Sequence, residues 1–369
     1  MIDDVARTTP AEKDGAGVGG DLVSRSVEAR LAARAAAPET ADAMRDGFGR
    51  SIDYLRISVT DKCNLRCVYC MPLHGLDWLR RDQLLTYEEI AEVIRVLAGM
   101  GLRRIRLTGG EPLVRRDLPV LVRLLAAIPQ IQDIALSTNA VLLQEMAEEL
   151  RQAGVQRLNI SLDSLRPERV DELARRPGSW KSIMAGIAAA ERAGFTPIKI
   201  NCVVMRGRND DELADFAAAT RDRPWHVRFI EVMPVAGSLD ISAREFIPAF
   251  EMLERLGALG ELEPTAGPAG NGPATYFRFP GAAGTVGVIT PMSHNYCDRC
   301  NRMRLTADGR LRPCLFGDLH TNLRDPLRAG EPLEPLIRQT LAIKPERHHL
   351  VQGQASGSGG LVALSQVGG

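Results

Sequence analysis

The sequence predicts an α/β protein, built as an incomplete, open TIM-type βα barrel with a smaller C-terminal module. Three observations predict this architecture. Strand-like and helix-like segments alternate six times between residues 52 and 234, which favours a parallel sheet with right-handed crossovers. Several of these strands alternate apolar and polar residues, whereas strands covered on both faces read as continuous apolar runs. Beyond residue 240 the alternation of strands and helices stops.

Six segments are expected to be the barrel strands: DYLRISVT, RIRLTG, DIALSTN, RLNISLD, IKINCVVM and HVRFIEVMP. The clearest helix between them is expected from Tyr87 to Gly101, because Thr86 and Glu89 have the spacing of a capping box and glycines stand at its end. In the C-terminal module, YFRFP, GTVGVIT and MRLTADGRLRPCLF are expected to be short strands. The last of these should fold as a hairpin around Asp308-Gly309.

The alternation within the predicted strands gives the barrel a polar interior. In the first strand the apolar positions share one face, and Arg56, Ser58 and Thr60 share the other. Arg106 and Lys199 hold equivalent polar positions in the second and fifth strands. A layer of helices can cover the apolar face. The polar face must then line a wet space or a polar ligand site, which an open barrel provides.

Composition limits the class of protein. The chain of 369 residues has 46 Lys+Arg and 46 Asp+Glu, a formal net charge of zero, which argues against a general nucleic-acid binder. It has no apolar run of about 18 residues, as a membrane span requires, and its start lacks the pattern of a signal peptide. We therefore expect a cytoplasmic protein that binds neither membranes nor nucleic acid.

The expected organisation has four parts. Residues 1–48 should be a disordered extension, residues 49–240 the barrel, and residues 241–350 the C-terminal module. Residues 351–369 should be a flexible, Gly-rich tail that ends in Gly-Gly.

Six of the seven cysteines form two groups of three: Cys63, Cys67 and Cys70, then Cys297, Cys300 and Cys314. The first triad directly follows the first predicted strand, at the barrel edge where catalytic residues gather. Three thiolates can hold three corners of an iron–sulfur cube and leave the fourth iron open to a small molecule. A closed zinc site is the alternative for each triad, completed by His74 in the first and by His294 or His320 in the second.

The motifs around the cysteines resemble a known family. The Cx3Cx2C spacing, with Tyr69 before its last cysteine, and TGGEP at Thr108–Pro112 resemble the radical S-adenosylmethionine (SAM) superfamily. Together with the second triad, RFIEVMP, the NRMR run at 301–304 and the terminal Gly-Gly, they make residues 50–369 similar to the GTP 3′,8-cyclase family of molybdenum-cofactor biosynthesis. The resemblance implies a [4Fe–4S] cluster on each triad, the first binding SAM and the second binding the substrate.

The resemblance also implies a reaction and a set of contacts. A 5′-deoxyadenosyl radical from SAM would remove the ribose C3′ hydrogen of GTP, and C3′ would join C8 of the guanine. The implied SAM contacts are Tyr69, Gly110, Ser161 and Met233. The implied GTP contacts are Arg56, Arg106, Ser137, Lys199, Arg302, Met303 and Arg304. A homodimer, an electron donor and a downstream cyclic pyranopterin monophosphate synthase are implied as partners.

Two other functions fit parts of the sequence. One is a radical SAM enzyme with auxiliary clusters that modifies a peptide, against which the NRMR run and the terminal Gly-Gly argue. The other is a zinc-stabilised binding module, which the neutral net charge and the repeated βα pattern disfavour. The iron and zinc content of the purified chain separates these possibilities.

Overall fold

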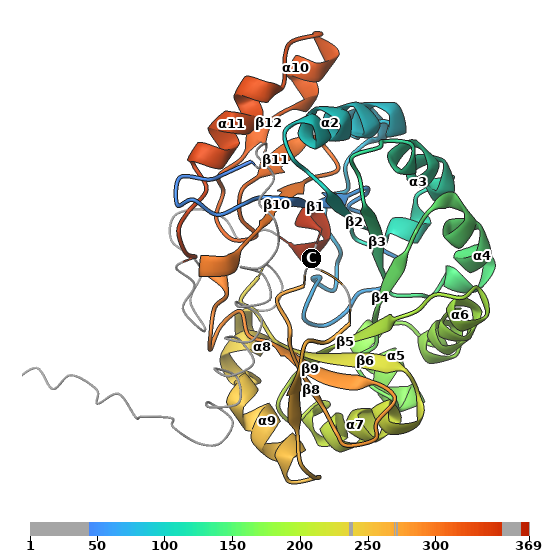
Figure 1. Ribbon diagram of the computed structural model, residues 1–369. Coiled ribbons are helices and arrows are strands. Elements are labelled where there is room, and N and C mark those ends of the chain that lie inside the picture. Colours follow the sequence, from blue (N-terminus) through green and yellow to red (C-terminus); the bar gives the residue numbers. More distant parts are fainter. Residues whose placement is uncertain (1–43, 236–238, 269, 271, 349–362, 369) are drawn as a thin grey trace, which may run out of the picture.

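The strands of the described chain form one curved sheet that does not close into a barrel (Figure 1). The computed structural model describes residues 44–235, 239–268, 270, 272–348 and 363–368. The strand order is β12-β11-β10-β1-β2-β3-β4-β5-β6-β9-β8-β7, so β12 and β7 are the two free edges. The predicted open α/β barrel is therefore confirmed.

The six barrel strands are the predicted ones, and neighbouring members pair in parallel. They are β1 (Tyr54–Ser58), β2 (Arg104–Thr108), β3 (Asp133–Thr138), β4 (Arg157–Ser161), β5 (Ile198–Val204) and β6 (Trp225–Glu231).

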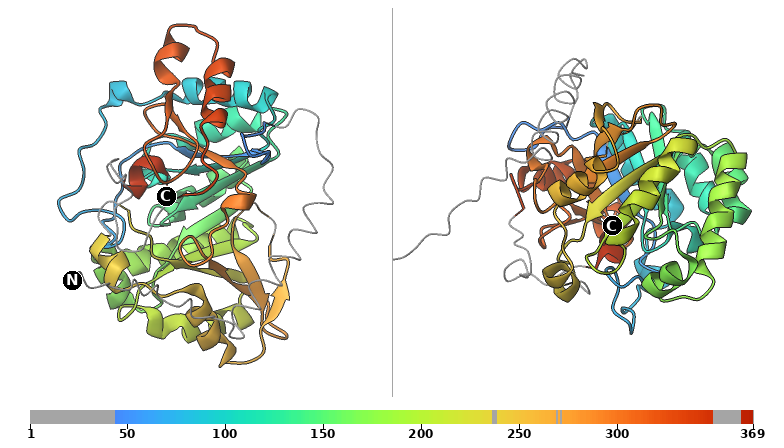
Figure 2. Two further views of the ribbon diagram at one scale, coloured as in Figure 1. Left: turned by 90° about the vertical axis from the view of Figure 1, so that its left-hand side faces the viewer. Right: turned by 90° about the horizontal axis from the view of Figure 1, so that it is seen from below.

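Most of the helices lie around the outside of the curved sheet (Figures 1 and 2). Those of the barrel are α2 (Tyr87–Gly99), α3 (Leu118–Ala126), α4 (Leu143–Ala153), α5 (Pro167–Ala174), α6 (Ser179–Arg192) and α7 (Leu213–Asp222). Helix α2 begins with the predicted capping box, in which Glu89 N donates to Thr86 Oγ1 at 3.2 Å and Thr86 N donates to Glu89 Oε2 at 2.7 Å. Four short 3₁₀ helices are η1 (Arg81–Gln83), η2 (Pro112–Val114), η3 (Asp210–Glu212) and η4 (Cys297–Arg299).

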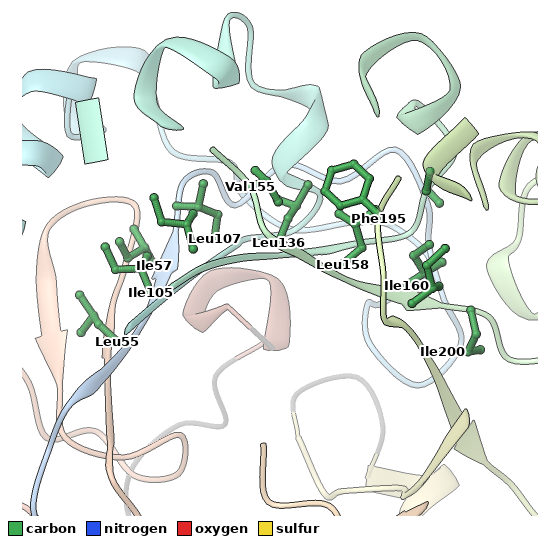
Figure 3. Close-up of a cluster of buried hydrophobic side chains, with 14 of the residues drawn as sticks. Leu55, Ile57, Ile105, Leu107, Leu136, Val155, Leu158, Ile160, Phe195 and Ile200 are labelled. Carbon is green, nitrogen blue, oxygen red and sulfur yellow. The ribbon is translucent and has the colours of Figure 1, made fainter. Parts of the chain in front are cut away.

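The core lies between the sheet and these helices. Ile57, Leu107 and Leu158 project from the apolar faces of three strands and are completely buried in it (Figure 3). Burying one such side chain contributes roughly 1.5–3 kcal/mol. This layer leaves the opposite, polar face of the strands free to line the inside of the curve.

The C-terminal region adds strands to both edges of the barrel sheet. Strand β9 pairs in parallel with β6, and β10 pairs in parallel with β1. Because β9 and β10 lie on opposite edges, the loop between them bridges the open side of the barrel. The predicted hairpin at Asp308-Gly309 joins β10 to β11. The added strands are β7 (Glu263–Thr265), β8 (Thr275–Arg278), β9 (Thr285–Ile289), β10 (Arg302–Leu305), β11 (Arg310–Arg312) and β12 (Thr321–Asn322).

Helices accompany the added strands. Helix α9 packs against α7 and β6, and α10 and α11 pack against α2. None of the helices in the described residues has the length and apolar character to cross a membrane. The helices of this region are α8 (Leu239–Arg244), α9 (Ala249–Gly257), α10 (Arg324–Arg328) and α11 (Glu334–Ala342).

Two terminal segments are more ordered than their composition predicts. Residues 44–48 were expected to be disordered, yet the Asp46 carboxylate is buried and accepts from the backbone N–H groups of Phe48 and Arg50. Helix α12 (Leu364–Val367) lies in the expected flexible tail but packs against β1 inside the curve of the sheet (Figure 1). The expectation of disorder is wrong for both segments, because each inserts buried side chains. Residues 1–43, 349–362 and Gly369 lie outside the described part.

Candidate active site

Three of the predicted basic residues lie side by side on the inner face of the sheet. Arg304 on β10 is paired in register with Arg56 on β1, and Arg56 with Arg106 on β2. Paired residues on neighbouring strands project from the same face, so the three guanidinium groups converge. The side chains of Arg106 and Arg304 are each only 6% exposed.

This arrangement places positive charges where water cannot screen them. Burial and the charge of Arg304 hold the pKa of Arg56 well below its usual value. Burial and the charge of Arg302 lower the pKa of Arg304 to about 10. The buried Nε atoms of Arg106 and Arg302 have no hydrogen-bond partner within the described residues. Buried like charges with unsatisfied donors are costly, so the site is built for a ligand with several negative charges.

The basic surface continues along the next strands. Ser137 on β3 is paired with Asn159 on β4, and Asn159 with Lys199 on β5. Burial and the charge of Arg228 lower the pKa of Lys199 to about 6. Lys199 shares this face, although it does not line the central cavity.

Arg228 on β6 is a site residue that the sequence reasoning missed. It is 1% exposed and lines the cavity, where its Nη2 donates to Asn159 Oδ1 at 2.7 Å. Its Nε has no hydrogen-bond partner in the described part of the chain. The alternation of apolar and polar residues in IKINCVV placed Lys199 on the polar face. HVRFIEV has an arginine between two apolar residues in the same way, and this signal would have identified Arg228.

A cavity of 270 Å³ joins the two cysteine triads inside the curve of the sheet. All six predicted cysteine ligands line it, and so do all four predicted SAM contacts. The predicted GTP contacts that line it are Arg56, Arg106, Ser137, Arg302 and Arg304. Met303 alternates with these arginines on β10, and its side chain is buried in the apolar core on the opposite face.

The first triad is held in the loop that follows β1. The backbone N–H groups of Arg66 and Val68 donate to the carbonyls of Ala174 and Leu173, which anchors the loop to the end of α5. Burial raises the pKa of Cys63 to about 11 and that of Cys70 to about 12. Thiols in such surroundings need a cationic partner to ionise, and bound metal supplies one. The triad therefore fits an iron–sulfur cluster.

The second triad differs in its electrostatics. Cys297 begins the short helix η4, Cys300 follows its last residue, and Cys314 follows β11. Burial alone would raise the pKa of Cys300, but the nearby charges of Lys344 and Arg302 lower it to about 7. This thiol is accordingly prepared to act as a thiolate ligand.

The positions of the histidines bear on the zinc alternative. His74, His294 and His320 are exposed and do not line the cavity. His348, which the sequence reasoning did not consider, lines it, and its ring lies 4.9 Å from that of Phe316. Within the described residues, no group of three or more His, Cys, Asp or Glu side chains is placed to hold a single metal ion.

Gly110 gives a first prediction. A Cβ at this position would lie 2.4 Å from the carbonyl oxygen of Lys62 and 2.5 Å from that of Asp61. We expect Gly110→Ala to lower the free energy of unfolding by about 1–3 kcal/mol, because backbone must move to admit the methyl group. Chemical denaturation measures this change. Gly99→Ala is the matched control, since nothing lies within 4 Å of its Cβ; an equal loss in both variants would contradict the prediction.

The fold and the cysteine triads define the class of protein. Residues 57–219 match the Radical SAM superfamily, and residues 225–350 match Molybdenum Cofactor Synthesis C. The fold is similar to that of the crystal structure of Streptococcus suis SuiB bound to S-adenosylmethionine, with a TM-score of 0.55 over 78% of this chain and 68% of that chain. At 16% identity this likeness concerns the fold alone.

Curated relatives narrow the class to one family. The chain is 49% identical over 329 residues to the GTP 3′,8-cyclase of Moorella thermoacetica. The aligned residues make up 88% of this chain and 100% of the relative. It is 48% identical over 305 residues to the GTP 3′,8-cyclase of Geobacter sulfurreducens, covering 82% and 93% of the two chains. The chain belongs to the GTP 3′,8-cyclase family.

Proposed function

We propose that this protein converts GTP to (8S)-3′,8-cyclo-7,8-dihydroguanosine 5′-triphosphate, the first step of molybdenum-cofactor biosynthesis, as a radical SAM lyase. The observation that carries this proposal is the cavity that brings both cysteine triads together with buried arginines. Cys63, Cys67 and Cys70 would hold the [4Fe–4S] cluster that binds SAM. Cys297, Cys300 and Cys314 would hold a second [4Fe–4S] cluster beside the substrate.

When bound, the first cluster and SAM would supply a 5′-deoxyadenosyl radical that takes the ribose C3′ hydrogen of GTP as 5′-deoxyadenosine forms. C3′ would then join C8, and one electron from the electron donor and one proton would complete the dihydro product. The protein contributes binding and orientation. The guanidinium groups of Arg56, Arg106 and Arg304, of which the last two belong to buried residues, suit the triphosphate, since arginine binds phosphate oxygens through two donors at once. The enclosing sheet and α12 restrict the access of water, which strengthens these charge interactions.

The residues proposed for SAM line the same cavity as the first triad. Gly110 has no side chain, so SAM could approach the backbone of the TGGEP segment closely. The phenol of Tyr69 donates to Asp163 Oδ2 at 2.8 Å, which fixes the loop between Cys67 and Cys70. Ser161 and Met233 line the same cavity.

The identity of the substrate is tested by one experiment. The reconstituted protein is incubated anaerobically with reductant, SAM and each of the four common nucleoside triphosphates, and the products are separated from the substrate by liquid chromatography and then analysed by mass. We expect a cyclised product of unchanged mass from GTP, together with 5′-deoxyadenosine. Cyclisation of another nucleotide, or modification of a peptide instead, would contradict the proposal.

The arginines give a second prediction. We expect Arg106→Ala to weaken GTP binding roughly 10- to 100-fold, because one charge-assisted contact is worth about 1.5–3 kcal/mol. Equilibrium binding of GTP to the reconstituted protein measures this change. Arg192→Ala removes an exposed arginine on α6 and serves as the charge-matched control. Unchanged affinity in Arg106→Ala would move the phosphate site elsewhere.

The setting of the enzyme is also part of the proposal. Grouped free thiols suit the reducing cytoplasm, where an electron donor would reduce the clusters. We infer that the protein works as a homodimer and passes its product to a cyclic pyranopterin monophosphate synthase.

A further inference from the structure

A buried lysine lies behind the second triad, and the proposed reaction does not use it. Lys344 follows α11 and is 3% exposed. Its Nζ donates to Cys300 Sγ at 3.5 Å, to the carbonyl oxygen of Arg302 at 3.0 Å and to that of Pro313 at 2.5 Å. An ammonium group has three N–H donors, so these acceptors satisfy all of them.

Among the described residues, no Asp or Glu side chain forms an ion pair with Lys344. A buried ammonium without an anionic partner is costly. The nearest atom that can carry negative charge in its hydrogen-bond shell is Cys300 Sγ. The buried charge of Lys344 is therefore stabilised when this sulfur is a negatively charged cluster ligand.

The acceptors of Lys344 also belong to both segments that supply the triad. Cys300 and Arg302 lie on the segment that leads into β10, whereas Pro313 immediately precedes Cys314. One side chain thus links the loop of the first two ligands to the loop of the third. Arg50 makes a different link: its guanidinium donates to the carbonyls of Cys297, Pro345 and Glu346 at 2.8, 2.7 and 2.7 Å, and to no sulfur.

We propose that Lys344 is a positioning residue for the second cluster, which fixes the two ligand loops and makes the cluster easier to reduce. A hydrogen bond and a positive charge at a ligand sulfur stabilise the form of the cluster that carries one more electron. Lys344 therefore raises the reduction potential of the second cluster relative to a chain without this charge. The inference rests on the two-cluster content of the proposed function.

The test compares Lys344→Met with Lys344→Arg after anaerobic reconstitution. Iron is counted per chain, and each cluster is followed by electron paramagnetic resonance during a redox titration. In Lys344→Met we expect the midpoint of the second cluster to move to a more negative potential while that of the first stays unchanged. Lys344→Arg keeps the charge and should move the midpoint less. Lys181→Met removes an exposed lysine on α6 and is the matched control.

The outcomes separate the inference from the proposed function. A wild-type chain with roughly four irons instead of roughly eight would overturn both. A wild-type chain with roughly eight irons, together with an unchanged midpoint in Lys344→Met, would overturn the inference alone. If Lys344→Met loses the second cluster and Lys344→Arg retains it, the positioning role is supported. Loss of the second cluster in both variants would show that Lys344 acts through packing alone, and would overturn the inference.

Discussion

In Cys63→Ala we expect SAM cleavage, and with it all cyclisation of GTP, to fall below detection. The first triad supplies three partly buried thiols to the lining of the cavity, and a cube with one open iron needs all three. Two remaining thiols would leave a second iron without a protein ligand. Formation of 5′-deoxyadenosine under anaerobic, reducing conditions measures the loss, and the iron content should fall from roughly eight to roughly four per chain.

Cys202→Ala is the matched control for this variant. Cys202 is a buried cysteine that belongs to neither triad, and its thiol lies 3.6 Å from the carbonyl oxygen of Asp163. Its removal should leave the iron content and SAM cleavage unchanged. Continued production of 5′-deoxyadenosine by Cys63→Ala would show that SAM is activated at a different site.

The barrel was predictable because its signal is local. Alternation of apolar and polar residues places Arg56, Arg106 and Lys199 on one face whatever the strand order. Each strand then buries its apolar face under the helices that follow it along the chain (Figure 3). Period-2 alternation needs no knowledge of distant contacts. The polar interior of the barrel follows directly.

The completed site was less predictable because it depends on pairings between distant segments. Nothing local in NRMR indicates that β10 joins β1 in parallel, yet this pairing brings Arg304 beside Arg56. The contacts of Lys344 and His348 with the second triad are of the same kind. Composition also misled at the tail, where a Gly/Ser-rich stretch precedes α12. The carbonyl oxygens of Val367 and Gly368 accept from Arg304 there, and a Cβ on Gly368 would meet Thr108 Cγ2 at 2.5 Å.

Removing a cysteine of the second triad should affect the reaction differently from removing one of the first. In Cys314→Ala we expect cyclisation of GTP to be lost while SAM cleavage continues. Cys314 lies after β11, and the loop of the first triad is held independently by its hydrogen bonds to Leu173 and Ala174. Loss of the second cluster therefore leaves the first triad in place. Roughly four irons per chain should remain.

The ratio of the two products measures this uncoupling. We expect Cys314→Ala to release 5′-deoxyadenosine without cyclised nucleotide, whereas Cys63→Ala releases neither. The contrast arises because both triads line one cavity, but the loop of the first triad is anchored to the end of α5, whereas the second triad lies in the segments that flank β10 and β11. Normal cyclised product from Cys314→Ala would refute a substrate role for the second triad. A zinc ion retained at that triad would identify it as a structural site, with His348 as the candidate fourth ligand.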